Sequence, residues 1–204
     1  MKNQYILIVG CTGVGKSSVA DFLHQYFRNS AYYSDPYIDN PFIANAYSTT
    51  DNKSFQSEIF FIKEFLKIHK SINNIKDKWV FQERSIFECV HIFCRLFLHQ
   101  QKIDQDEYNL CVDLLDELSE NLRTPDAIIY LRADPSIIKE RIITRSREFE
   151  KTINLDFIQL QQSLYEQWIE HFVKNNCSSI IEIDNSMNNI AATNEETLLK
   201  IKNL

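Results

Sequence analysis

The sequence predicts an α/β fold in which a central parallel sheet of about five strands is covered by helices on both faces. Short apolar segments of strand length alternate with longer segments whose apolar residues recur at helical spacing. Such strands are typical of parallel sheets buried on both sides. The three glycines of the chain all lie in one loop, directly after the first strand segment and before a helical segment. This arrangement predicts that a phosphate-binding loop opens the fold.

The strand segments are recognised by their length and their apolar content. Tyr5 to Val9 is a run of apolar residues that leads into the glycine loop, and the later segments are equally short. The predicted strands are residues 5–9, 31–34, 79–82, 127–131 and 179–183.

Helical spacing of apolar residues fills the intervals between these strands. Pro135 suits the first position of one helix, which runs into an arginine-rich stretch at residues 141–147. Residues 35–54 are polar and rich in turn signals, so no helix is predicted there. The predicted helices are 19–27, 55–69, 86–98, 107–122, the helix from Pro135, 156–173 and one near Glu195. No linker or repeat divides the chain, so we expect one domain over residues 1–204.

Composition restricts the class of protein. The hydrophobic fraction of 44% and charged fraction of 25% are those of a globular protein, and no apolar run has the length of a membrane span. A net charge of −6 argues against a nucleic-acid polymer as partner. The first core strand begins near residue 5 and leaves no room for a signal peptide, which predicts a cytoplasmic protein.

The cysteines and histidines carry no sign of a metal site or a disulfide framework. The histidines have no metal-ligand spacing, and the cysteines are odd in number and lack a C-x-x-C pair. We therefore expect reduced thiols. The five cysteines are Cys11, Cys89, Cys94, Cys111 and Cys177.

The glycine loop fits the pattern G-x-x-x-x-G-K-[ST] from Gly10 to Ser17. Its backbone amides and the following helix N-terminus would face phosphate oxygens. Lys16 adds a mobile positive charge, and the hydroxyl of Ser17 can ligate Mg²⁺. The alternative, an ordinary strand-turn-helix, explains neither the lysine nor the concentration of glycine. The predicted nucleotide-binding residues of the loop are Gly10, Gly13, Val14, Gly15, Lys16, Ser17 and Ser18.

Two further polar clusters follow predicted strands, at the edge of the sheet where ligands bind in such folds. Asp35 stands before Pro36, and Glu83 stands before Arg84. A carboxylate beside a phosphate-binding loop can hold Mg²⁺ directly or through water. An adjacent arginine can stabilise charge that develops on a transferring phosphoryl group.

A fourth cluster contains Arg141, Arg145, Arg147 and Glu150. Arg141 and Arg145 share one helix face because they are four residues apart. Arginines on a mobile segment suit a lid over a triphosphate, here at about residues 141–151. The alternative is a solvated basic helix paired with local glutamates, which surface charge alone would favour. Because the same chain contains a phosphate-binding loop, we expect the lid rather than the solvated helix.

Taken together and in this order, these motifs resemble the deoxynucleoside kinase family, whose members include deoxyguanosine, deoxyadenosine and deoxycytidine kinases. The similarity runs from the glycine loop to about residue 184. It includes Asp35-Pro36, Asn40-Pro41-Phe42, Tyr47 before a Phe-rich helix, Glu83-Arg84-Ser85-Ile86, Ile129-Tyr130-Leu131-Arg132 and Arg141 to Glu150.

The resemblance implies a P-loop kinase fold and the Mg²⁺-dependent transfer of the γ-phosphoryl group of ATP to the 5′-hydroxyl of a deoxynucleoside, a nucleotide-salvage reaction. Lys16 and Arg84 would act at the reacting centre, and Asp35 would be the general base where the family usually has glutamate. Glu83 with Ser17 would bind the metal. A homodimer is expected. The other implied contacts are Tyr47 and Glu150 with the sugar 3′-hydroxyl, Phe93 stacked on the base, and Arg141, Arg145 and Arg147 with the donor phosphates.

The positions that read the base depart from the family pattern. Glu58 replaces the usual glutamine, Phe65 an arginine, and Cys89 an aspartate or alanine. Either the base specificity is unusual or nucleoside activity is lost. An ionised Glu58 offers only hydrogen-bond acceptors, and guanine alone of the four common bases presents two adjacent donors. This predicts a guanine preference. Glu58 as a solvated helix residue and Phe93 as a core residue are the alternatives.

Two other functions fit part of the sequence. A nucleoside monophosphate kinase of the thymidylate-kinase type shares the loop, an arginine motif and a lid. Its acceptor is a dianion, however, which a carboxylate at Asp35 would repel. A nucleotide-binding regulator without turnover would explain the altered base-reading residues. We expect the deoxynucleoside kinase.

Overall fold

A five-stranded parallel sheet forms the centre of the protein, as the sequence predicts. The computed structural model describes residues 4–48, 50–176, 179–187 and 189–203. The strand order is β2-β3-β1-β4-β5. Ile8 is in register with Glu83 of one neighbouring strand and Ile129 of the other, so the carboxyl ends of these central strands are level. The strands are β1 (Tyr5–Val9), β2 (Ser30–Tyr33), β3 (Trp79–Glu83), β4 (Ala127–Arg132) and β5 (Ser179–Asp184).

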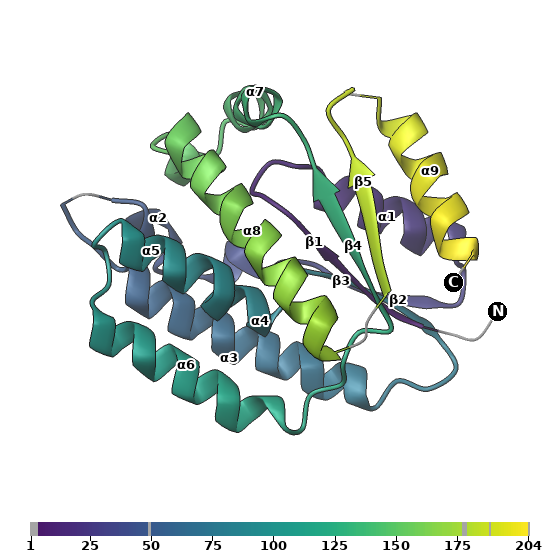
Figure 1. Cartoon of the computed structure of the whole chain (residues 1–204), viewed down its shortest axis with the longest axis horizontal. Coiled ribbons are helices and arrows are strands. Elements are labelled where there is room, and N and C mark those ends of the chain that lie inside the picture. The colour runs from purple at the N-terminus through teal and green to yellow at the C-terminus, as the bar shows by residue number, and fades with distance from the viewer. Residues whose placement is uncertain (1–3, 49, 177–178, 188, 204) are drawn as a thin grey trace.

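Helices cover both faces of this sheet, which confirms the predicted layers (Figure 1). One face carries α1 (Lys16–Tyr26) and α9 (Ile190–Lys202), which pack on each other. Helix α7 (Pro135–Arg145) lies beyond the carboxyl ends of the strands (Figure 1). The other face carries α3 (Ser54–Asn73), α4 (Ile86–Glu88), η2 (Cys89–Cys94), α5 (Arg95–His99), α6 (Gln105–Ser119) and α8 (Leu155–Asn176).

Local sequence signals set several helix ends. The Asp104 side chain accepts a hydrogen bond from the backbone amide of Glu107 at 2.8 Å, and the Glu107 side chain accepts one from the backbone amide of Asp104 at 3.0 Å, so a capping box begins α6. Asp134 caps α7 through the amide of Ser136, with Pro135 at the first helical position as predicted. Ser146 ends α7 in a left-handed conformation with φ 54°. The arginine-rich segment therefore changes direction directly after Arg145.

Two segments differ from the sequence prediction. Residues 86–98 were expected to form one helix, but the central part, η2, is π-helical. Residues 35–54 contain a 3₁₀ turn, η1 (Tyr37–Asp39), and a short helix, α2 (Ile43–Ala46). These elements are too short to leave a periodic signal. They are held by side chains from elsewhere, because the Asn40 amide donates to Ser57 Oγ at 2.9 Å.

The core explains why the strand segments are so apolar. Every residue of β1 is fully buried, and β3 and β4 are nearly so. The described cysteines, Cys11, Cys89, Cys94 and Cys111, are buried and free, in agreement with the expected thiols. Cys177 lies outside the described residues. Within the described ranges, none of the helices combines the length and apolar character needed to cross a bilayer.

Candidate active site

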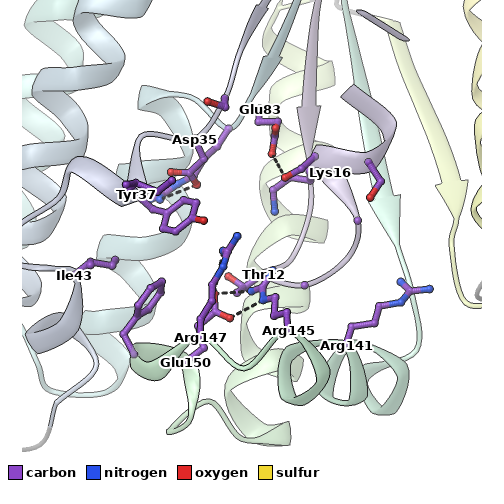
Figure 2. A pocket seen from close by; sticks show the side chains of 18 of the residues that line it. Thr12, Lys16, Asp35, Tyr37, Ile43, Glu83, Arg141, Arg145, Arg147 and Glu150 are labelled. Atoms are coloured by element: carbon purple, nitrogen blue, oxygen red, sulfur yellow. Dashed lines mark hydrogen bonds and ion pairs between the residues drawn. The ribbon is translucent and has the colours of Figure 1, made fainter. Parts of the chain in front are cut away.

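A cavity of about 620 Å³ lies at the carboxyl ends of the strands (Figure 2). Its walls come from the glycine loop, the segments that follow β2 and β3, and the segment around the end of α7. All three polar clusters predicted at strand ends thus meet in one place, together with the arginine-rich cluster. This is the position at which parallel α/β sheets bind ligands.

The glycine loop forms one wall of the cavity. Gly10 and Gly13 have φ values of 138° and 87°, which other residues rarely adopt. A Cβ at Gly10 would collide with the carbonyl oxygen of Leu131, and one at Gly13 would lie 2.8 Å from Ile142 Cγ1. Lys16 Nζ donates to the carbonyl oxygens of Gly10 and Cys11 at 2.7 and 3.0 Å. The ammonium group is therefore held folded over the loop, and burial lowers its pKa.

A carboxylate and two hydroxyl groups meet beside the lysine. Ser17 Oγ donates to Glu83 Oε2 at 2.7 Å, and the hydroxyl of Tyr32 donates to Glu83 Oε1. Burial raises the pKa of Glu83, although both hydrogen bonds and Lys16 act in the opposite direction. Sequence reasoning missed Tyr32. The feature that could have identified Tyr32 is its position near the end of a predicted strand, where ligands bind in such folds.

The pair Ser17 and Glu83 fits Mg²⁺ by the chemistry of its oxygen donors. Among the described residues, no group of three His, Cys, Asp or Glu could hold a metal ion by itself. Mg²⁺ commonly binds to one or two protein oxygens together with substrate phosphates. The donor set agrees with a metal that arrives with a nucleotide.

Asp35 and Arg84 meet at the opposite end of this cluster. Arg84 Nη1 lies 3.6 Å from Asp35 Oδ2, while Asp35 Oδ1 is buried and has no hydrogen-bond partner in the protein. Arg84 adopts a left-handed backbone conformation with φ 57° just past the end of β3. Its carbonyl accepts a hydrogen bond from the Gln82 amide at 2.7 Å. Strain of this kind, in a non-glycine residue, is typical of functional sites.

The arginine-rich cluster is organised by one buried carboxylate. Arg145 donates from Nε and Nη2 to both oxygens of Glu150, at 2.6 and 2.5 Å, and Arg147 Nη1 lies 3.4 Å away. Glu150 is 2% exposed. The guanidinium of Arg147 also lies 4.0 Å from the ring centroid of Tyr37. Two arginines and a glutamate therefore project together into the cavity (Figure 2).

Arg141 differs from the other two arginines. Its guanidinium donates to the carbonyl oxygens of Val14 and Asn185 at 3.2 and 2.7 Å, and it points away from the other labelled arginines (Figure 2). The Asn185 amide donates to the same Val14 oxygen at 2.8 Å. Arg141 thus ties α7 to the glycine loop. Asn185 was missed by sequence reasoning, although it directly follows the last strand.

The cavity wall contains most of the residues predicted from the sequence. Four predicted residues lie outside it: Gly10 and Val14, whose places are inside the loop, and Glu58 and Cys89, which lie behind Arg84. The predicted residues on the wall are Gly13, Gly15, Lys16, Ser17, Ser18, Asp35, Tyr47, Glu83, Arg84, Phe93, Arg141, Arg145, Arg147 and Glu150. The residues that were not predicted include Thr12, Tyr32, Tyr37, Phe149 and Asn185.

The base-reading candidates have a different environment from the one expected. Glu58 is 2% exposed, and its Oε2 accepts a hydrogen bond from Arg84 Nη2 at 3.1 Å. Burial raises the pKa of Glu58 to about 7, with Arg84 acting in the opposite direction. Glu58 is therefore not a solvated helix residue. Phe93 is nearly buried but does reach the cavity, where its ring lies against Arg84.

A phosphate-binding loop, an oxygen-ligand pair, a buried carboxylate and several arginines around one cavity define a nucleotide-dependent phosphotransferase. The model of the deoxynucleoside kinase family matches residues 6–204. The chain therefore belongs to the deoxynucleoside kinase family, which confirms the class and the fold predicted from the sequence.

Individual relatives agree with this assignment. The chain is 30% identical over 175 residues to the deoxyadenosine/deoxycytidine kinase of Bacillus subtilis, covering 84% of this chain and 79% of that protein. It is 26% identical to the deoxyguanosine kinase of the same organism, covering 79% and 76%. Its fold matches deoxyadenosine kinase from M. mycoides with the products dCMP and a flexible dCDP bound, with a TM-score of 0.85 at 21% identity and coverage of 98% and 100%.

Proposed function

We propose that this protein transfers the γ-phosphoryl group of ATP to the 5′-hydroxyl of a deoxynucleoside in a Mg²⁺-dependent reaction. One observation carries the proposal beyond family membership. Asp35 places a buried carboxylate oxygen without a protein partner on the wall of the same cavity as the glycine loop. Such an oxygen is suited to accept a hydrogen bond, and then a proton, from a neutral hydroxyl.

The roles follow from the positions of the charged groups. Asp35 accepts the proton of the attacking hydroxyl, and Arg84 stabilises the charge that develops on the transferring group. Lys16 exchanges its contacts with loop carbonyls for the β- and γ-phosphates of the donor. Ser17 and Glu83 would hold Mg²⁺, which neutralises charge on the donor phosphates.

The sugar and the donor phosphates meet at Glu150. We propose that Tyr47 and Glu150 hold the 3′-hydroxyl, while Arg145 and Arg147 grip the donor phosphates as a lid. Two observations support this division. Glu150 is buried and pairs with both arginines. The Tyr47 ring packs against Phe149, the residue that precedes Glu150 in the chain. Arg141 secures the base of the lid through its contact with Val14.

A monophosphate acceptor is less compatible with these groups. The acceptor end of the cavity carries the carboxylates of Asp35 and Glu150, and Arg84 there already faces Asp35. A dianionic acceptor would have to displace this pair and lie beside these carboxylates, whereas a nucleoside brings no charge. This supports a nucleoside over the monophosphate of the thymidylate-kinase type.

The guanine preference based on Glu58 stays a prediction. A guanine that bonds to Glu58 has to take the place of Arg84 on that carboxylate. Values of kcat/KM for the four deoxynucleosides, in the wild type and in Glu58→Gln, test it. Deoxyguanosine as the best substrate, with a ranking that changes in the variant, would support base reading by Glu58. Any other best substrate, or an unchanged ranking, would contradict it.

One assay separates the proposed function from its rivals. Purified protein is given ATP and Mg²⁺ with either a nucleoside or its monophosphate, and ADP is followed. The proposal expects turnover with nucleosides. Turnover with monophosphates alone would favour the thymidylate-kinase type, and ATP binding without turnover would favour a regulator. The homodimer and the cytoplasmic location predicted from the sequence analysis remain part of the proposal, and light scattering at assay concentration tests the dimer.

A further inference from the structure

The guanidinium of Arg84 is enclosed on four sides. Its central carbon lies 4.3 Å from the ring centroid of Phe61 and 3.7 Å from that of Phe93. Each Nη faces a different carboxylate, Asp35 at 3.6 Å and Glu58 at 3.1 Å. The two rings restrict the plane of the guanidinium, so the carboxylates decide where it sits within that plane.

The two carboxylates do not hold Arg84 equally. The 3.1 Å separation to Glu58 is a hydrogen bond, whereas 3.6 Å to Asp35 is beyond the usual range. Glu58 is nearly buried, and its charge is compensated by this contact. Asp35 keeps an oxygen that no group of the protein bonds. Arg84 is therefore held closer to Glu58 on α3 than to Asp35, the proposed general base.

We propose that Glu58 is a positioning residue, which holds Arg84 back from the Asp35 carboxylate and so leaves Asp35 open to the substrate hydroxyl. The inference rests on the proposed function of Asp35. Without Glu58, Asp35 is the one carboxylate with which Arg84 forms an ion pair among the described residues, and the guanidinium would move onto it. A base clamped by a direct guanidinium bond accepts a proton less readily, because the positive charge favours the ionised carboxylate.

The charge of Glu58 makes this positioning depend on pH. Burial raises the pKa of Glu58 to about 7. Above that pH the ionised carboxylate holds the guanidinium, and below it the protonated, uncharged carboxyl group is a weaker acceptor for the guanidinium. The activity should therefore fall as the pH decreases through about 7. The titratable and charged groups that face Glu58 are Asp35, Tyr47, Arg84, Cys89 and Cys94.

Two substitutions separate the geometry from the titration. Glu58→Met removes every acceptor at similar size, so kcat should fall by about tenfold or more, as expected for a misplaced group at the reacting centre. Glu58→Gln keeps one acceptor oxygen but cannot titrate. It should retain more kcat than Glu58→Met and lose the decrease near pH 7. On this proposal the base ranking should stay unchanged in Glu58→Gln, which is the opposite of the outcome expected if Glu58 reads the base.

The matched control is Glu64→Met on the same helix. Glu64 pairs with Lys63 and Lys67 rather than with any group of the cavity. The Glu64→Met variant should keep the wild-type kcat and pH profile. The inference would be overturned if Glu58→Met behaved like this control, if Glu58→Gln kept the decrease near pH 7, or if its ranking of the bases changed.

Crystal structures of the wild type, Glu58→Met and Glu58→Gln separate this inference from the proposed function. In Glu58→Met the distance from Arg84 Nη1 to Asp35 Oδ2 should shorten from 3.6 Å to about 2.9 Å, a direct charge-assisted bond. In Glu58→Gln it should stay near the wild-type value. An unchanged distance in Glu58→Met overturns the positioning role even in an active enzyme. A shortened distance in a protein without kinase activity supports positioning and contradicts the proposed function instead. If Glu58→Met does not fold, the pH profile of Glu58→Gln alone decides.

Discussion

A second buried carboxylate, Glu88, should control how stability depends on pH. Glu88 is 0% exposed and lies one residue before the π-helical segment. Tyr165 donates to its Oε1 at 2.8 Å and Ser85 to its Oε2 at 3.3 Å. Burial raises its pKa to about 7, while these hydrogen bonds and the charges of Lys16 and Arg84 act in the opposite direction. We predict that Glu88→Gln raises the free energy of unfolding, relative to the wild type, by more at alkaline pH than at acidic pH.

The sign follows from linkage between protonation and folding. The pKa of Glu88 is higher in the folded state than the ordinary value of 4.5. Its protonated form therefore favours folding below about pH 4.5, and this contribution is lost as the pH rises through about 7. A shift from 4.5 to about 7, at about 1.36 kcal/mol per pH unit, amounts to about 3 kcal/mol. Glutamine keeps the shape and does not titrate, so the variant avoids this loss.

The assay is urea unfolding of wild type and Glu88→Gln at several pH values from about 5 to 8 at constant ionic strength. The difference in the free energy of unfolding, variant minus wild type, should rise with pH by up to about 3 kcal/mol. His69 and His91, whose pKa values burial lowers to about 4, titrate in both proteins and cancel. Exposed Glu117→Gln is the control and should give a constant difference. A constant difference for Glu88→Gln would refute the reasoning.

Three further substitutions test the site. Lys16→Ala should lower kcat by about 10²–10³ with the fold intact by circular dichroism; more than a tenth of wild-type kcat would contradict the assignment of the loop. Asp35→Asn should lower kcat by about 10²–10⁴ and preserve the Kd for ATP; a weaker Kd with kcat unchanged would place Asp35 among the phosphate contacts instead. Gly13→Ala should lower the free energy of unfolding by about 1–2 kcal/mol, because a side chain at this positive φ is strained and its Cβ meets Ile142; unchanged urea unfolding would show that the loop accommodates the methyl group.

The sheet and the phosphate loop could be predicted because both depend on local sequence. The apolar residues of β1 and the glycine pattern lie in adjacent segments, so no long-range contact is needed to recognise them. The rule that parallel strands end at the ligand site then brought Asp35 and Glu83 to the same cavity. The resemblance added Tyr47 and Phe93.

The contacts that sequence reasoning missed join residues far apart in the chain. Glu58 and Arg84 are 26 residues apart, and their pairing depends on how α3 packs beside the end of β3. The pattern predicted that Glu58 reads the base, which stays a prediction, but it gave no sign of the pairing with Arg84. Asn185 could have been found by applying the strand-end rule to the last strand. Arg141, by contrast, could not be separated from Arg145 by spacing, since only the packing of α7 on the loop sets them apart.

The central claim is that this protein phosphorylates the 5′-hydroxyl of a deoxynucleoside, and product identification tests it most directly. The protein is incubated with ATP labelled in the γ-phosphoryl group, Mg²⁺ and each deoxynucleoside, alongside the matching 5′-deoxy analogue that lacks the accepting hydroxyl. We predict labelled 5′-monophosphate in equal amount to ADP, no labelled product from the analogue, and none from Lys16→Ala. Absence of labelled product from every deoxynucleoside, or labelling of the 5′-deoxy analogue, would contradict the claim.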